Sequence, residues 1–134
     1  MKSSATAFKL ERNLVQDLSK VVTPPKETVE AQHIIKHEGK PIYCADIFLQ
    51  KGCKALKMKG PAVIEVKKTP LFDTVLQQKN AFERIKRCGI KTFILAVDEE
   101  NAYFKPSNKD GFEVLKVGEL YNRIKEVSSK VDAD

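Results

Sequence analysis

The spacing of apolar residues divides the chain into helical and extended segments. Apolar positions recur every three or four residues over 4–22, Leu71–Cys88 and Gly118–Ser129, and this period predicts three amphipathic helices. Shorter apolar or alternating runs predict strands at Gln32–Lys36, Ile42–Leu49, Ala62–Lys67 and Thr92–Val97, and an edge strand at Phe112–Val117. The order α-β-β-β-α-β-(β)-α is typical of an α/β domain with a mixed central sheet flanked by helices.

The remaining segments have the composition of loops, turns and tails. Gln50–Gly60 is rich in lysine and contains two glycines, so we expect a flexible loop there. Pro106–Gly111 has the composition of a turn, and Gly89 is placed to cap the end of the second helix. Thr92–Val97 is almost wholly apolar, which favours a central strand buried on both faces. Residues 126–134 are expected to form a frayed tail of one domain spanning residues 1–134.

Length and composition narrow the class of protein. A chain of 134 residues with 42% hydrophobic residues is expected to fold as one domain with its own core. No apolar run approaches the roughly 18 residues of a membrane span, and no apolar segment near the N-terminus precedes a signal cleavage site. The three cysteines, Cys44, Cys53 and Cys88, include no CxxC pair, so a cytoplasmic protein is expected. His33 and His37 could suggest zinc, but no cysteine pair has zinc-knuckle spacing.

The net charge of +6 favours a polyanionic partner, and the excess is unevenly placed. Residues 51–68 carry six lysines against one acid, and residues 76–91 carry five basic residues against one acid. We therefore expect a phosphate-binding surface formed by exposed lysines of these two stretches: Lys51, Lys54, Lys57, Lys59, Lys68 and Lys79.

Two predicted helices carry a polar residue on the apolar face. Glu11 falls within the apolar arc of the first helix, and Gln78 lies near the centre of the apolar arc of the second. A carboxylate that faces a core must be satisfied by a cation or by hydrogen bonds. Glu11 could therefore form a buried ion pair with a lysine or arginine, or reach a metal site. Gln78 could bond a strand-end backbone group or point at a ligand.

Two strands supply further buried charges. Asp46 is the only charged residue in Ile42–Leu49, and alternation places Glu65 and Lys67 on the same face of Ala62–Lys67. Glu65 and Lys67 could form a salt bridge within the strand. A divalent metal offers a common explanation for all these groups, because carboxylate oxygens bind Mg²⁺ or Mn²⁺ and the cation offsets the cost of burying the acids.

This pattern resembles the PD-(D/E)XK nuclease superfamily, which has the restriction-endonuclease-like fold. Asp46 and the run Glu65-Val66-Lys67 match the motif, with Ala45 where the motif has proline, and Glu11 matches an acidic residue often found on the family's first helix. Gln78, with Phe82 four residues later, resembles the QxxxY helix motif of Mrr-like restriction enzymes and RecB-type nucleases. The resemblance covers roughly residues 4–98. Within the superfamily, the chain is most similar to Mrr-like restriction enzymes and small Holliday-junction resolvases.

The resemblance implies a metal-dependent endonuclease that hydrolyses phosphodiester bonds in duplex or branched DNA, with RNA also possible. Asp46 and Glu65 would hold Mg²⁺, for which Mn²⁺ could substitute, with help from the Val66 carbonyl and Glu11. Lys67 would orient or activate the attacking water, and Gln78 would help place Lys67, the water or the DNA backbone.

Two further expectations concern partners. Cutting both strands with one site per domain favours a homodimer, with the Phe112–Val117 edge strand and the last helix as candidate interface elements. The alternative to an enzyme is a catalytically weak or inactive protein of the same fold, acting as a basic nucleic-acid-binding or assembly subunit. Metal-dependent cleavage separates the two.

Overall fold

The computed structural model describes the backbone of residues 2–67, 74–97 and 105–133, and the side chains of residues 9–67, 74–97 and 105–129. In chain order the elements are α1 (Lys2–Ser19), β1 (Glu30–His37), β2 (Lys40–Leu49), β3 (Gly52–Cys53), β4 (Met58–Lys59), β5 (Ala62–Lys67), α2 (Thr74–Ile85), the 3-10 turn η1 (Lys86–Cys88), β6 (Thr92–Val97), β7 (Ser107–Lys109), β8 (Phe112–Lys116) and α3 (Val117–Ala133).

Six of the strands form one mixed sheet in the order β1-β2-β5-β6-β8-β7. The central strands β5, β6 and β8 run parallel, whereas β2 is antiparallel to β5, and β1 and β7 are antiparallel to their single neighbours. The α/β class and the mixed sheet predicted from the sequence are therefore confirmed. The strands predicted at Ala62–Lys67 and Thr92–Val97 have the bounds of β5 and β6.

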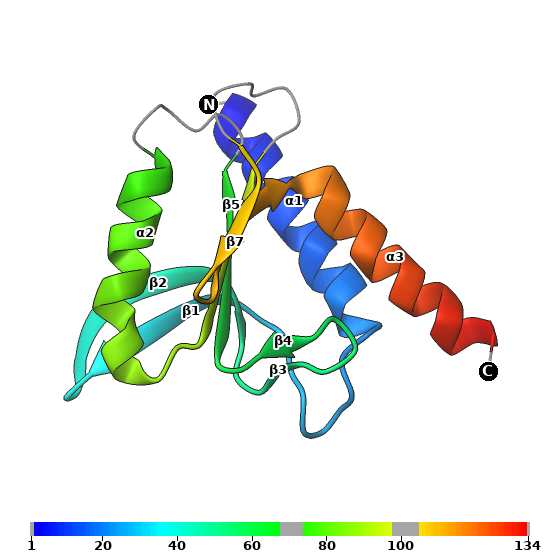
Figure 1. Cartoon of the computed structure of the whole chain (residues 1–134), viewed down its shortest axis with the longest axis horizontal. Helices are drawn as coiled ribbons and strands as arrows, with labels where there is room; N and C mark the ends of the chain where they lie inside the picture. The colour runs from blue at the N-terminus through cyan, green and yellow to red at the C-terminus, as the bar shows by residue number, and fades with distance from the viewer. Residues whose placement is uncertain (1, 68–73, 98–104, 134) are drawn as a thin grey trace.

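The sheet separates two layers of helices, as Figure 1 shows, with α2 on one side and α1 and α3 on the other. The α1/α3 side buries one apolar cluster, which includes Leu14, Leu18 and Leu120, and the α2 side buries a second, which includes Phe82 and Ile85. Alternate residues of β6 enter each cluster, which explains why its sequence is apolar at almost every position.

The prediction of an edge strand at Phe112–Val117 is wrong. β8 occupies that segment, but it lies between β6 and β7, and its buried positions face both neighbouring layers. The outer strand is β7, which forms within the segment predicted as a turn and consists of three exposed polar residues. An edge strand needs no apolar pattern because only its backbone must pair, so β7 carried no strand signal.

The segment expected to be a flexible loop, Gln50–Gly60, contains the hairpin of β3 and β4. Its base is closed by two glycines in close contact. A Cβ atom on Gly52 would lie 2.2 Å from the Met58 carbonyl oxygen, and one on Gly60 would lie 2.2 Å from the Gly52 nitrogen. These distances leave room for no side chain at either position, so the hairpin depends on both glycines.

Three sequence expectations concern the ends of the helices. The predicted start of the second helix at Leu71 lies outside the described residues. Gly89 caps η1, which follows α2, in the left-handed conformation expected of a C-cap. The last helix, α3, continues to Ala133, so most of the segment expected to be a frayed tail is helical. No helix in the described part of the chain is long and apolar enough to cross a membrane.

Candidate active site

The carboxylates of Asp46 on β2 and Glu65 on β5 meet where the pairing of these two strands ends. Their register runs from Leu49↔Ala62 to Ile47↔Ile64, so Asp46 and Glu65 are the next residues beyond the paired segment. Each carboxylate accepts a hydrogen bond from a backbone N–H of the other strand. The Val66 N–H donates to Asp46 Oδ2 at 3.1 Å, and the Asp46 N–H donates to Glu65 Oε1 at 3.3 Å. The two acids predicted from separate strands are therefore brought together.

Glu65 is almost completely buried, with 2% of its surface exposed. Burial and the neighbouring Asp46 carboxylate raise the pKa of Glu65 to about 9. Neither acid forms an ion pair with a cation of the described residues. The salt bridge between Glu65 and Lys67, left open from the sequence, is therefore not formed.

Tyr43 on β2 connects this acid pair to α2. Its hydroxyl donates to Glu65 Oε1 at 2.6 Å and lies 3.3 Å from Gln78 Oε1. Burial and the Glu65 charge raise the pKa of Tyr43, so its hydroxyl keeps its proton and remains a donor. Tyr43 therefore contacts both Gln78 and Glu65, and it links α2 to the acid pair.

Glu11 approaches the same region from α1. It is buried, and its Oε1 accepts a hydrogen bond from Gln32 Nε2 at 2.5 Å. Burial and the charge of Asp46 raise the pKa of Glu11. Among the described residues Glu11 forms no ion pair with a lysine or arginine, and its hydrogen-bond partner is a neutral amide. An amide donor satisfies the carboxylate without neutralising it.

Gln32 is held in an unusual backbone conformation at this point. Its φ is 53°, in the left-handed region, within β1. The pairs Ala31↔Ile47 and His33↔Ala45 place Gln32 opposite Asp46. Strain of this kind in a residue other than glycine often accompanies a functional site, because the rest of the fold must hold it in place. Here it directs the amide toward Glu11.

Lys67 and Val66 complete the predicted set. Lys67 is half-buried at the end of β5, two residues beyond Glu65, so the two side chains share a face of the strand. Lys67 forms no hydrogen bond or ion pair with the described residues. Val66 lies between them and is buried, with its N–H engaged by Asp46.

The donor atoms fit a hard divalent cation in part. Mg²⁺ takes oxygen ligands and is commonly held by one or two carboxylates while it keeps several waters, which matches a pair of adjacent acids. Within the described residues, no three His, Cys, Asp or Glu side chains gather closely enough to hold a metal ion by themselves. A cation at Asp46 and Glu65 would thus need a backbone oxygen or water as well.

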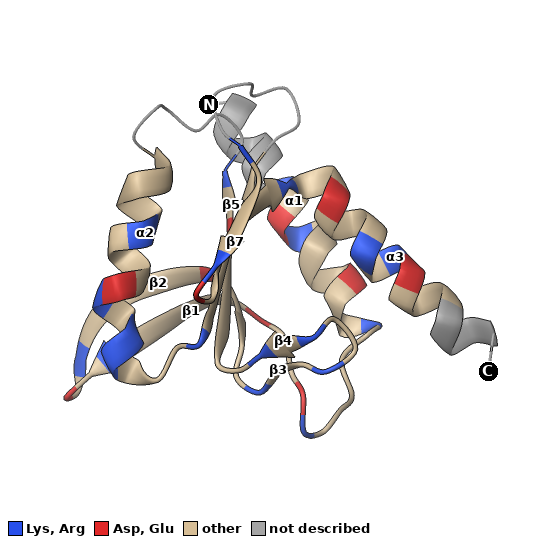
Figure 2. Cartoon of the chain, viewed as in Figure 1, with Lys and Arg blue, Asp and Glu red and all other residues tan. Residues whose placement is uncertain are grey.

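Those lysines predicted to contact nucleic acid that the structure describes do not form one continuous surface around this site. Figure 2 shows basic residues on the hairpin of β3 and β4 and on α2, which lie in different parts of the molecule. Lys51, Lys54, Lys57, Lys59 and Lys79 are all exposed. Lys57 and Lys59 line a cavity against α3, on the opposite side of the sheet from α2. Lys68 lies outside the described residues.

Tyr43 and Gln32 were missed by the sequence analysis. Tyr43 precedes Asp46 by three residues, and regular alternation would have placed these side chains on opposite faces. They meet at Glu65 because β2 leaves its pairing with β5 beyond Ile47. Nothing in the sequence signals a left-handed conformation at Gln32, because glycine is the residue that normally marks one.

No protein-family model, curated protein or solved structure matches this chain.

Proposed function

We propose that the protein is a metal-dependent nuclease that hydrolyses phosphodiester bonds in DNA, with Asp46 and Glu65 at its centre. The observation that carries the proposal is the contact between these two acids from different strands, with one of them buried and neither paired with a cation of the described residues. Placing two carboxylates together in this way is unfavourable for folding alone. A bound divalent cation would offset that cost, and the resemblance to PD-(D/E)XK nucleases points to the same chemistry.

Asp46 and Glu65 would hold Mg²⁺ or Mn²⁺, with the Val66 carbonyl as a further ligand and Glu11 nearby on α1. The cation, when bound, would polarise the phosphate and favour the ionised form of an attacking water. The raised pKa of Glu65 means that the acid must lose its proton as the cation binds, so metal affinity should rise with pH.

The other residues would act on the substrate and on these ligands. Lys67 carries its ammonium group on the same face of β5 as Glu65, where it would attract the phosphate and offset negative charge that develops during hydrolysis. Tyr43 would keep one Glu65 oxygen in place through the hydrogen bond that its hydroxyl donates. Gln78 would position water or the DNA backbone from α2. We further propose that the protein works as a homodimer, which would present two such sites to the two strands.

The test is a cleavage assay on plasmid and synthetic-junction DNA with Mg²⁺, Mn²⁺ or EDTA. The proposal expects cleavage with either metal, none with EDTA, and none for Asp46→Ala or Glu65→Ala. Glu27→Gln is a matched control, because Glu27 is also a buried acid but bonds the backbone N–H groups of Thr23 and Lys54. Salt-dependent DNA binding without any cleavage would instead favour the basic binding or assembly subunit. Cleavage by both alanine variants at the wild-type rate would show that the site is elsewhere.

A further inference from the structure

A cavity of about 600 Å³ lies between the hairpin of β3 and β4, the start of β6, β8 and α3. We call it the hairpin cavity. Its charged lining residues are Lys57, Lys59, Lys91, Glu113 and Arg123, and its neutral polar ones are Thr92 and Asn108. A volume of this size is typical of pockets that hold small molecules. It lies on the α1/α3 side of the sheet, and none of the residues of the candidate active site lines it, so the two sites are separate.

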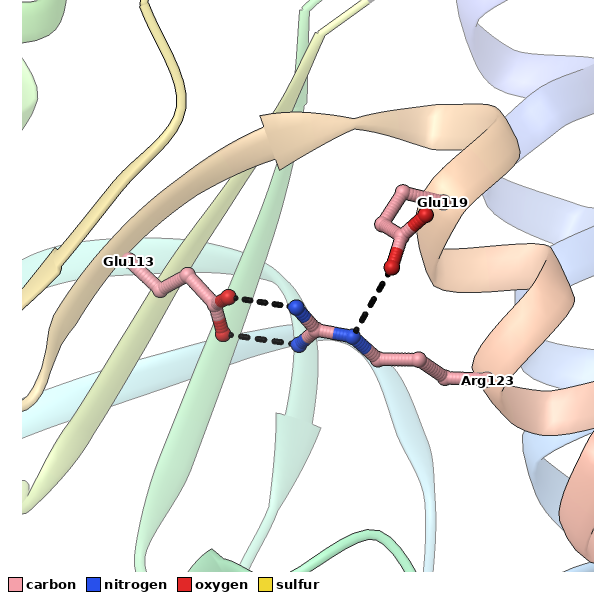
Figure 3. Close-up of polar contacts among 3 residues, drawn as sticks. All are labelled: Glu113, Glu119 and Arg123. Atoms are coloured by element: carbon pink, nitrogen blue, oxygen red, sulfur yellow. Dashed lines mark hydrogen bonds and ion pairs between the residues drawn. The ribbon is translucent and has the colours of Figure 1, made fainter.

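The cavity has an excess of positive charge. Lys57, Lys59 and Lys91 are exposed, and none of them forms an ion pair within the described part of the chain. The one acid in the lining, Glu113, is already paired. Arg123 donates to its two oxygens at 3.0 and 2.8 Å, and Figure 3 shows this fork together with the contact from Arg123 to Glu119. The three lysines therefore line the cavity without a carboxylate partner among the described residues.

The wall that carries two of these lysines is held in place from several sides. The Thr92 hydroxyl donates to the Lys59 carbonyl oxygen at 2.8 Å, which ties β4 to the start of β6. The Lys54 N–H donates to the buried Glu27 carboxylate at 2.7 Å, which anchors the hairpin to the segment that follows α1. Lys57 takes a left-handed conformation with φ 58° at the turn. Lysines on a fixed backbone lose less entropy on binding an anion than lysines on a mobile loop.

The cavity also has an apolar surface. Met58, Ile94 and Leu120 are buried residues of the α1/α3 core, and each contributes to the lining. Cations beside an apolar surface suit a ligand with an anionic group joined to a flat, weakly polar ring system. A nucleotide has this combination, because its phosphate accepts hydrogen bonds from ammonium groups and its base can lie against apolar side chains.

We propose that the hairpin cavity binds a nucleotide phosphate, with Lys57, Lys59 and Lys91 as the phosphate-binding residues. The ligand is a free nucleotide or one nucleotide unit of a nucleic-acid strand, since both present the same phosphate chemistry. The proposal does not depend on cleavage at Asp46 and Glu65, because no residue of that site lines the cavity.

The test is isothermal titration calorimetry of the full chain in EDTA with AMP, adenosine, inorganic phosphate and a short single-stranded DNA. We expect AMP or the DNA to bind and adenosine to bind much more weakly. Lys57→Glu/Lys91→Glu should weaken that binding by roughly tenfold or more, the effect of losing hydrogen bonds to a charged group. The control Lys36→Glu/Lys40→Glu has the same change in charge at exposed positions on β1 and β2, and it should bind as the wild type does.

The probes and a second measurement decide between outcomes. Binding of AMP identifies a free nucleotide as sufficient, and binding of DNA alone identifies a strand unit. Should the lysine variant not fold, NMR titration of the wild type with each probe should shift the backbone amides of Thr92 and Asn108. Absence of any phosphate-dependent binding, or equal loss in both double variants, would overturn the proposal. Asp46→Ala should bind these probes normally, so a failure of the nuclease proposal remains distinguishable from a failure of this one.

Discussion

Replacing Glu65 with glutamine should raise the free energy of unfolding of the metal-free protein at pH 7. The native pKa of this acid is about 9, against an ordinary value of 4.5. At pH 7 the folded chain therefore keeps Glu65 protonated, while the unfolded chain would release that proton. Because the unfolded state binds fewer protons, stability should fall as pH rises from about 4.5 toward 9. Glutamine has no acidic proton to lose, so the variant should not show this loss of stability with rising pH.

The magnitude follows from the distance between pH 7 and the ordinary pKa. The difference is about 2.5 pH units, and each unit corresponds to roughly 1.4 kcal/mol. Ionisation of Glu65 in the unfolded chain therefore lowers the free energy of unfolding of the wild type by about 3 kcal/mol at pH 7. The glutamine amide can also replace the bonds of the protonated acid. Its oxygen can accept from Tyr43 and from the Asp46 N–H, as Glu65 Oε1 does, and its NH₂ group can donate to the Asp46 carboxylate.

The assay is chemical denaturation in EDTA at several pH values between 5 and 9. We expect a sloping stability profile for the wild type and a flatter, higher one for Glu65→Gln. In Glu27→Gln, an NH₂ group would face a backbone N–H donor, so this control should lose stability and keep the slope. A Glu65→Gln protein that is less stable than the wild type at pH 7, or equally dependent on pH, would refute the assignment of a protonated Glu65 beside Asp46.

Three further predictions test other parts of the structure. Tyr43→Phe removes the hydroxyl that donates to Glu65, so kcat should fall about tenfold, or roughly 1.4 kcal/mol, with little change in KM for DNA; unchanged kcat would remove Tyr43 from the site. Glu11→Gln removes a buried charge, so thermal melts should show higher stability in EDTA and a smaller stabilisation by Mn²⁺, whereas an Mn²⁺ effect equal to that of the wild type would separate Glu11 from the metal site. Gly52→Ala should cost about 2 kcal/mol or more because its Cβ meets backbone atoms, whereas Gly39→Ala, also at positive φ but in open space, should cost about 1 kcal/mol; equal losses in denaturation would contradict the close contact.

Much of the sheet and the positions of the helices could be predicted because burial imposes a pattern on the sequence. β6 is apolar throughout because both helical layers cover it, and Glu11 could be placed on the inner face of α1 because the opposite face is polar. The hairpin strands β3 and β4 have two residues each, which is too short for alternation to be visible. β7 is exposed at all three positions, so its sequence carries no trace of its pairing with β8.

In the candidate site, too, some residues could be predicted from the sequence and others could not. Asp46, Glu65 and Gln78 could be selected because each is a polar residue in an apolar setting. Their partners could not, since the contact of Tyr43 with Glu65 arises where β2 leaves its regular pairing, and the bond from Gln32 to Glu11 arises from one left-handed residue. Local departures of the backbone from ideal geometry depend on the whole fold, and a hydrophobic pattern does not encode them.

The irregular course of β1 also affects how copies of this protein can meet. β1 is an outer strand of eight residues, and its Ile34 side chain is 52% exposed, a combination that invites pairing with a strand of another chain. The left-handed φ at Gln32 and the shift of register between Ile35 and Lys36 interrupt the row of backbone groups along this edge. An incoming strand would find only a short regular segment between the two interruptions. The distortion that turns Gln32 toward Glu11 therefore also protects the protein against edge-to-edge aggregation.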